Sequence, residues 1–253
     1  METKQKVDRE NQFEKIEIPK GILMFLEKRA GIQNHEFEKT YSVSKILTCL
    51  RKSYYGELNY EKEIISRDAE LEQLWSTTRG DLLHEITRAY RWRELDTKFK
   101  VYLENGKIIS ISGRLDMYDW KTKTIIDLKT TKFVNWQISK KLIPRAEHIR
   151  QIQCYGTMFS GIIPVERLCL VYADMDGLVA FRVQNKDMTK WMTMRVQELE
   201  EAIEKQIPPK GQVSSLCQFC SYQGRCFDDG NGITYEPTSI PKSRTMFKST
   251  EID

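Results

Sequence analysis

The chain has 253 residues, of which 40% are apolar, 30% charged and 10% aromatic. This length accommodates one large domain or two small ones, and the composition is typical of a soluble globular protein with a real core. The formal net charge of +4 permits an acidic partner such as nucleic acid but does not require one.

Membrane insertion and secretion are not indicated. No apolar run approaches the roughly 18 residues of a transmembrane helix, and residues 1–20 carry mixed charges without the apolar region of a signal peptide. We therefore expect a cytoplasmic protein that does not bind membranes. Six cysteines in that compartment are more often metal ligands, redox groups or core residues than disulfides.

Helices are predicted in the first part of the chain. Residues 42–58 predict one helix, with Ser42 or Ser44 as a possible N-cap. Residues 67–92 have apolar side chains at helical spacing, and Gly80 interrupts the pattern. The second segment therefore predicts either one kinked helix or two helices.

The period then changes to two, which is typical of strands. Residues 98–104 and 107–118 predict two strands, and Asn105-Gly106 between them predicts a tight hairpin turn. Residues 124–130 (TIIDLKT) predict a third strand after a short polar link.

Helices and strands alternate again in the C-terminal half. Residues 145–160 predict a helix, residues 165–184 two strands, and residues 187–207 a long helix that ends at Pro208-Pro209. This order predicts a mixed α/β domain with a central sheet flanked by helices.

Asp127 and Lys129 stand two residues apart in the third strand, so their side chains share one face. A hairpin would bring Asp116 of the preceding strand beside Asp127, and the repulsion between the two carboxylates would be relieved by Mg²⁺ or Mn²⁺. Lys129 would then orient the attacking water or stabilise charge on a phosphate. The alternative is an ordinary solvated strand face.

Four motifs in chain order resemble the RecB-like branch of the PD-(D/E)xK nuclease superfamily. They are RGDLLHE with His84, GRLD with Asp116, DLK with Asp127 and Lys129, and QIQCY with Gln151 and Tyr155. The resemblance implies a restriction-endonuclease-like core and hydrolysis of DNA phosphodiesters. The chain departs from the family pattern in two ways: the proline of the motif is absent, and the second acid is Asp127 rather than the commoner glutamate.

The resemblance also implies a role for each residue of these motifs. His84, Asp116, Asp127 and the carbonyl of Leu128 would hold Mg²⁺ or Mn²⁺, and Lys129 would orient the water. Gln151 and Tyr155, one helical turn apart, would line the site and contact the DNA backbone or support the lysine. Without the other motifs, His84 on an amphipathic helix would be read as a surface or core residue.

A second group of candidate ligands is formed by cysteines. Cys217, Cys220 and Cys226 follow a C-x2-C-x5-C pattern, and metal sites of this kind use four ligands. We expect Cys49 to be the fourth ligand. Cys154 and Cys169 are alternatives, although both are typical of small buried apolar residues. Ligand chemistry alone leaves zinc and iron–sulfur open.

The cysteine spacing is similar to that of RecB-like nucleases with an iron–sulfur cluster, most of all the CRISPR-associated iron–sulfur exonucleases. This resemblance implies a structural [4Fe-4S] cluster, trimming of single-stranded or end-frayed DNA before spacer integration, and CRISPR integrase proteins as partners. The predicted domains are an N-terminal extension (1–40), a nuclease domain closed by the cluster (41–227) and a polar tail (228–253).

Two stretches combine aromatic and basic residues, a pattern that suits single-stranded nucleic acid. Residues 51–55 read RKSYY, and residues 129–141 contain four lysines with Phe133 and Trp136. An ordinary solvated surface is the alternative. Other functions left open are a repair or viral nuclease of the same chemistry and a non-catalytic DNA-end-binding subunit.

Overall fold

The computed structural model describes residues 39–63, 67–87, 92–175, 177–213, 217 and 219–230, all within the unit Lys39–Asp253. The predicted N-terminal extension, apart from its last two residues, and nearly all of the predicted tail lie outside the described residues. The division of the chain at residues 40 and 227 therefore stays a prediction.

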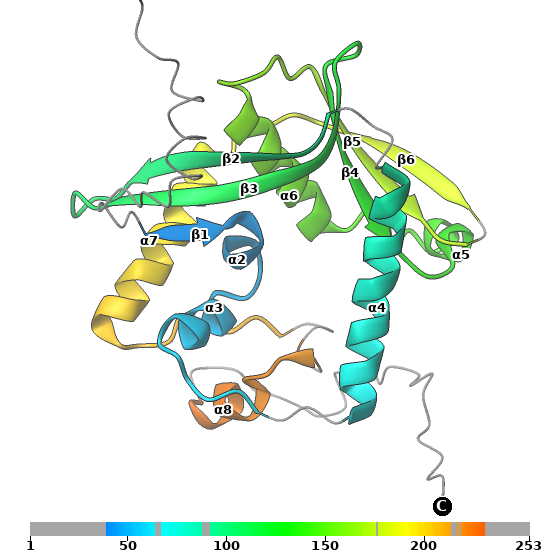
Figure 1. Cartoon of the computed structure of the whole chain (residues 1–253). Helices are drawn as coiled ribbons and strands as arrows, with labels where there is room; N and C mark the ends of the chain where they lie inside the picture. Colours follow the sequence, from blue (N-terminus) through cyan, green and yellow to red (C-terminus); the bar gives the residue numbers. More distant parts are fainter. Residues whose placement is uncertain are drawn as a thin grey trace, which may run out of the picture. The chain divides into compact units, whose positions relative to one another are not determined.

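In the described part of the chain, six strands form one mixed sheet (Figure 1). The path runs β1-β3-β4-β5-β6, and β2 pairs with β3 off this path. β1 lies parallel to β3 and β4 parallel to β5, whereas the other pairs are antiparallel. The strands are β1 (Thr40–Ser42), β2 (Arg93–Tyr102), β3 (Ile108–Asp119), β4 (Thr124–Thr130), β5 (Arg167–Ala173) and β6 (Leu178–Val183).

The predicted hairpin joins β2 to β3. Its turn is closed by the N–H of Gly106, which donates to the carbonyl of Leu103. Gly106 has a φ of 80°, in the left-handed region that glycine adopts without a Cβ penalty. The prediction of two strands around Asn105-Gly106 is therefore confirmed, although β2 begins five residues earlier than expected.

Helices flank this sheet, so the predicted mixed α/β architecture is confirmed. No helix among the described residues is both long and apolar enough to cross a bilayer. The helices are α2 (Val43–Leu47), α3 (Leu50–Glu57), α4 (Arg67–Ile86), α5 (Val134–Ser139), α6 (Ala146–Phe159), α7 (Thr189–Lys205) and α8 (Gln223–Asp228).

The predicted single helix over residues 42–58 is wrong in one respect. Ser42 ends β1 and is the N-cap of α2, because its side-chain oxygen accepts the N–H of Lys45. The helical segment then breaks at Thr48 and Cys49 before α3 begins. Gly80, in contrast, lies inside the continuous helix α4.

Helix α6 crosses the strands that carry the candidate acids, and it approaches β3 closely. A Cβ at Gly113 would lie 2.9 Å from Met158 Cε and 3.1 Å from the ring of Tyr155. Glycine at this position therefore sets the distance between the helix and the sheet. The core around this contact includes Ile46, Ile111, Leu115, Ile125, Ile152, Leu168, Leu170 and Met192.

Candidate functional site

Strands β3 and β4 bring the first two candidate acids together. Their register pairs Met117 with Ile126, so its continuation places Asp116 opposite Asp127. One oxygen of Asp116 accepts the backbone N–H of Leu128 at 2.7 Å. In a regular antiparallel pair, a backbone carbonyl of β3 would accept this N–H. Here the side chain of Asp116 accepts it instead.

Asp127 and Lys129 point to the same side of β4, as their spacing predicts. The Lys129 ammonium lies 2.8 Å from an oxygen of Asp127. Asp127 is only 1% exposed, so the alternative of a solvated strand face is wrong for this residue. A buried carboxylate needs cationic or hydrogen-bonding partners, and Lys129 supplies one of them.

Leu128 lies between these residues and has a buried side chain. Its N–H points toward Asp116. In an extended strand the N–H and C=O groups of one residue point to the same neighbour. The carbonyl oxygen of Leu128 is therefore directed to the edge of β4 where Asp116 stands.

Helix α6 adds the QxxxY pair to this site. The side-chain amide of Gln151 donates to the hydroxyl of Tyr155 at 3.0 Å. Burial and the negative charge of Asp127 raise the pKa of Tyr155, with a smaller effect from Asp116. Tyr155 is therefore a neutral phenol beside both acids.

His148 is a polar residue of the site that the sequence analysis missed. It precedes Gln151 by three residues and Tyr155 by seven, which places all three on one face of α6. Its Nδ1 lies 2.8 Å from the hydroxyl of Tyr172, which neighbours Lys129 across the β4–β5 pair. The i, i+3, i+7 spacing was the available sequence pattern.

The His148 side chain is neutral in this setting. Burial lowers its pKa to about 3, and the positive charges of Lys129 and Arg145 act in the same direction. The N–H of Arg145 donates to the Tyr172 hydroxyl oxygen at 2.9 Å, which leaves the hydroxyl proton for Nδ1 of His148. The ring proton of His148 is accordingly on Nε2.

His84 belongs to α4, but its side chain lies outside the described residues, so its predicted role remains a prediction. The helix itself packs beside β4. A Cβ at Gly80, one turn before His84, would lie 3.9 Å from the hydroxyl oxygen of Thr130. The motif RGDLLHE is thus carried by a helix that contacts the strand of Asp127 and Lys129.

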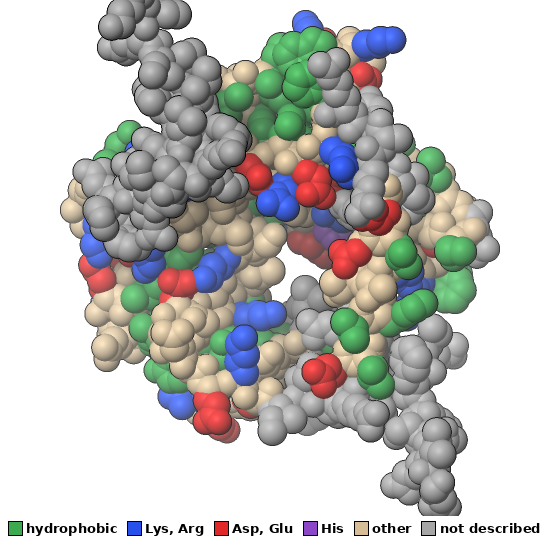
Figure 2. Space-filling model, viewed as in Figure 1, with side chains coloured by type: hydrophobic (Ala, Val, Ile, Leu, Met, Phe, Trp, Pro, Cys, Tyr) green, Lys and Arg blue, Asp and Glu red, His purple; other side chains and the backbone are tan. Residues whose placement is uncertain are grey.

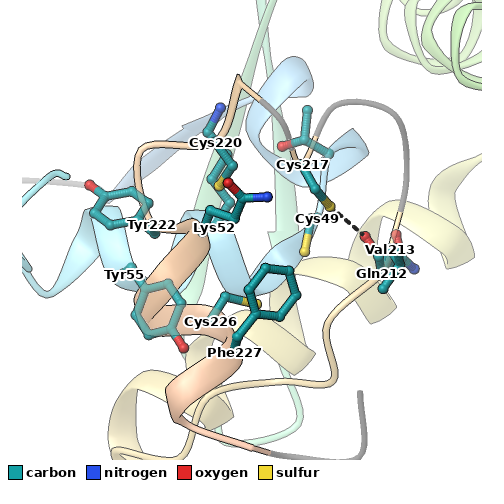
Figure 3. Close-up of a pocket in the computed structure, with 12 residues that line it drawn as sticks. Cys49, Lys52, Tyr55, Gln212, Val213, Cys217, Cys220, Tyr222, Cys226 and Phe227 are labelled. Atoms are coloured by element: carbon teal, nitrogen blue, oxygen red, sulfur yellow. Dashed lines mark hydrogen bonds between the residues drawn. The ribbon is translucent and has the colours of Figure 1, made fainter. Parts of the chain in front are cut away.

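The four predicted cysteine ligands line one pocket between α3 and the C-terminal segment (Figure 3). Cys49 comes from the break between α2 and α3, and Cys226 from α8. The pocket contains about 90 Å³ of free volume. The alternative ligands do not line it: Cys154 is buried in the core and Cys169 lies on β5.

Arg195 of α7 fixes the break that carries Cys49. Its guanidinium donates to the carbonyls of Ile46 and Thr48 at 3.0 and 2.7 Å. Both carbonyls belong to the end of α2, where backbone acceptors have no partner within the helix. The chain can therefore turn at Cys49 without leaving these groups unsatisfied.

The C-terminal cysteine segment is also attached by contacts that involve no cysteine. The two carboxylate oxygens of Glu63 accept the N–H groups of Gly224 and Arg225, at 2.9 and 2.8 Å. The hydroxyl of Tyr55 donates to Asp229 at 2.7 Å. These bonds hold α8 against the segment that follows α3.

Comparison with known proteins identifies the family. The family model of the PD-(D/E)XK nuclease superfamily matches residues 40–227, which is most of the chain. The chain belongs to the PD-(D/E)XK nuclease superfamily. Nucleases of this superfamily are hydrolytic, act on DNA and use divalent metal ions such as Mg²⁺.

Two solved structures resemble this nuclease. The crystal structure of SSO0001 has 21% sequence identity and a TM-score of 0.56, and the match covers 81% of this chain and 96% of that one. A phage-related exonuclease from Haemophilus somnus 129PT has 13% identity and a TM-score of 0.39, with 72% and 88% covered. No curated protein matches the chain. The first likeness supports the fold alone.

The composition of the acid site suits a hard divalent cation. Asp116, Asp127 and the Leu128 carbonyl offer oxygen ligands, and Mg²⁺ is usually bound by one or two carboxylates together with water and substrate phosphate. No group of three or more His, Cys, Asp or Glu side chains close enough for one ion occurs among the residues described. A pair of acids with a backbone carbonyl is compatible with that finding.

The two aromatic and basic stretches differ in the structure. Arg51, Tyr54 and Tyr55 are buried, so the interpretation of residues 51–55 as a DNA-binding surface is wrong. Phe133 and Trp136, at the start of α5 and within it, are more than half exposed. Figure 2 shows lysine and arginine side chains, with acidic ones among them, around a hollow on the face drawn.

Proposed function

We propose that this chain is a metal-dependent DNA exonuclease that acts on single-stranded or end-frayed DNA. The observation that carries the proposal is the convergence of Asp116, Asp127 and Lys129 at the edge of β4, with Asp116 bonded to the backbone between the other two. A buried acid beside a second acid and a lysine is unfavourable as a purely structural arrangement and useful at a metal-assisted phosphoryl site.

Asp116, Asp127, the Leu128 carbonyl and His84 would hold Mg²⁺ or Mn²⁺. When bound, the ion supplies charge neutralisation at the phosphate and lowers the pKa of water. Lys129, held by Asp127, places a positive charge where charge develops on the phosphate.

Helix α6 would position the DNA strand. The neutral Gln151 and Tyr155 pair offers hydrogen-bonding groups to the phosphate backbone without adding negative charge. Because Gln151 donates to Tyr155, the phenol proton is available to an incoming oxygen. These two residues therefore orient the strand, and the acids and Lys129 act on its phosphodiester.

Preference for single strands is supported by the exposed aromatics near α5. Phe133 and Trp136 are more than half exposed, and Lys132, Lys140 and Lys141 flank them in the sequence. Unpaired bases stack on such rings, and neighbouring cations neutralise phosphates. Paired bases in a duplex would not be available for this contact.

The most specific form of the proposal is trimming of DNA ends for CRISPR spacer acquisition, with integrase proteins as partners. Its support is the combination of the nuclease motifs with the cysteine pattern in one chain. The proposal includes a reducing cytoplasmic compartment, because thiol ligands must remain reduced. The acid and lysine set argues against a purely DNA-binding subunit.

The proposal also includes a [4Fe-4S] cluster at the cysteine pocket. Its support in the structure is that all four cysteines line one pocket, which gathers the four thiol donors that such a centre uses. The support for iron–sulfur rather than zinc is the similarity of the cysteine spacing to that of iron–sulfur nucleases.

The nuclease proposal is tested with single-stranded DNA labelled at either end, incubated with the purified chain and Mg²⁺ or Mn²⁺. We expect shortening of the DNA that requires the ion and is lost in Asp116→Asn, Asp127→Asn and Lys129→Met. Asp96→Asn is the matched control, because this exposed acid on β2 pairs with Arg114 at the surface. Equal activity in wild type and the three site variants would refute the assignment.

The cluster is tested by analysing metal and sulfide in chain purified without oxygen. Iron and acid-labile sulfide in equal amounts, lost in Cys220→Ala, are expected. Cys154→Ala is the control, since its thiol lies in the core and away from the pocket. A colourless protein with one zinc per chain would contradict the iron–sulfur assignment and leave the nuclease proposal intact.

A further inference from the structure

Arg51 is a charged side chain that is completely buried beside the cysteine pocket. It is 0% exposed and is the largest fully buried side chain of the described residues. Its Nη1 lies 3.9 Å from the sulfur of Cys226. Its Nε and Nη2 have no hydrogen-bond partner among the described residues.

This environment is unusual for a guanidinium, which stays protonated at all accessible pH values. A buried cation requires an anionic partner, because its desolvation is otherwise uncompensated. Other arginines of the chain have such partners: Arg114 pairs with Asp96, Arg195 with Glu198 and Arg225 with Asp229.

Among the described residues, no ion pair joins Arg51 to a carboxylate. Asp229, the acid of this region, is bonded to Tyr55 and Arg225, and no ion pair between it and Arg51 is found in the described structure. The polar atom that Arg51 does reach is a cysteine sulfur. Four thiolates around a divalent core leave a net charge of about −2, which would supply the missing anion.

We propose that Arg51 is the internal charge partner of an anionic metal–thiolate centre in the cysteine pocket, and that it strengthens metal retention and raises the reduction potential of the centre. This inference rests on the proposed cluster. It adds a residue outside the ligand set, one whose buried charge is compensated when the pocket holds negative charge. Arg51 neighbours Cys49 in sequence and contacts Cys226 in space, so it also links the two ligand segments.

The test compares wild type with Arg51→Met, Arg51→Lys and Lys52→Met in full-length chain purified without oxygen. Lys52 lines the same pocket but is exposed, so Lys52→Met removes an equal charge where solvent screens it. We measure metal content, the rate of metal loss to a chelator, the reduction potential, and the Tm with and without metal.

Arg51→Met should lose metal about 10-fold faster or more, as is typical when a residue supporting a metal ligand is removed. Its reduction potential should fall, because a cation beside the cluster favours the reduced state. Arg51→Lys should be intermediate and Lys52→Met should change less. In metal-free chain, Arg51→Met should be at least as stable as wild type, because the unpaired cation is gone.

Three results would overturn the inference. If wild type takes up neither iron nor zinc, the centre itself and the role of Arg51 both fail. If wild type holds metal and Arg51→Met matches it in retention and potential, only the role of Arg51 fails. If Arg51→Met does not fold where metal-free wild type does, Arg51 is a structural residue of the core.

Discussion

At position 113 the space for a side chain is already filled by helix α6. A methyl group there would meet Met158 at 2.9 Å and the ring of Tyr155 at 3.1 Å. Met158 has a flexible end that can move, whereas Tyr155 is a ring held by Gln151. Gly113 therefore affects the site by setting the position of α6 and its Tyr155. Asp116, three residues later, is itself one of the candidate metal ligands.

Gly113→Ala should destabilise the chain by about 1–3 kcal/mol, the usual cost of overpacking. It should also lower nuclease activity more than this loss of stability explains, because the Tyr155 ring must shift. Urea unfolding and the DNA assay measure the two effects. Gly161→Ala is the control, since nothing lies within 4 Å of its added Cβ. Equal effects of both variants would contradict the close-contact argument.

The buried imidazole of His148 makes the stability of the chain depend on pH. Its pKa is lowered to about 3 in the fold, against about 6.5 in an unfolded chain. The unfolded state therefore binds more protons between these values. The contribution of neutral His148 is complete above about pH 6.5 and is lost as the pH falls toward 3.

His148→Gln keeps an acceptor for the Tyr172 hydroxyl but removes this titration. Wild type should be the more stable protein at pH 7.5, and its advantage should shrink as the pH falls to 5. The measurement is Tm at half-unit pH steps for both proteins. A constant difference in Tm over this range would show that His148 does not titrate as described.

At the scale of elements, the break between α2 and α3 depends on contacts with α7. Residues 42–58 have a continuous helical pattern, so local sequence did not reveal the break at Thr48 and Cys49. It forms because Arg195, distant in sequence, bonds the carbonyls of Ile46 and Thr48. Tertiary contacts of this kind override helix propensity.

Arg195→Met should lower the free energy of unfolding by about 2 kcal/mol. Hydrogen bonds from charged donors contribute about 1.5–3 kcal/mol each, and water will replace Arg195 as the donor to part of these carbonyls. The substitution should also weaken metal retention at the cysteine pocket, because Cys49 loses its fixed position. Arg182→Met on β6 is the control, an exposed arginine far along the chain from this break. Urea unfolding and chelator competition test both expectations.

The short elements were the ones that sequence patterns missed. β1, α5 and α8 have three, six and six residues, too few to show a hydrophobic period. They are positioned by distant partners: β1 by β3, and α8 by Glu63. Most long elements, in contrast, were located within two residues at each end, with β4 matched at both ends. The exceptions are the start of β2 and the end of α4, which differ by five and six residues from the prediction.

At the scale of the whole molecule, two kinds of contact stabilise the described part of the chain. One apolar core joins the sheet to α2, α3, α6 and α7 and also includes Tyr222 of the cysteine segment. The cysteine segment is fastened to α3 and its extension by Glu63, Tyr55 and, in the proposal, by metal. The apolar core needs no metal. Chelation should therefore act on the cysteine segment and not on the sheet.

Removal of the metal should loosen the cysteine segment and leave the sheet intact. Hydrogen exchange should accelerate in residues 58–63 and 217–230 but stay slow in α3, β3, β4 and β5. The proposed nuclease activity with Mg²⁺ restored should decline only in part. Cooperative loss of protection in the sheet would mean instead that the centre is required for the whole fold.

The strand order was the part of the architecture that the sequence could not supply. The pairing of β4 with β5 is parallel and spans α5 and α6, and no local pattern encodes such a partner. The candidate acids were easier to predict, because Asp116 and Asp127 are joined by a short hairpin. His148 was missed because its place in the site depends on a contact with Tyr172 of β5, which this non-local pairing brings near.

The hydrogen bond from the Leu128 N–H to Asp116 has a consequence for which substitutions the two acids tolerate. Asp116 fits its carboxylate to a fixed backbone amide, so a glutamate there would carry the carboxylate one methylene past its donor. Asp127 accepts a mobile ammonium instead, and Lys129 can follow a longer side chain. Two acids that look interchangeable in the motif are thus held differently, and we expect Asp127→Glu to keep more nuclease activity than Asp116→Glu.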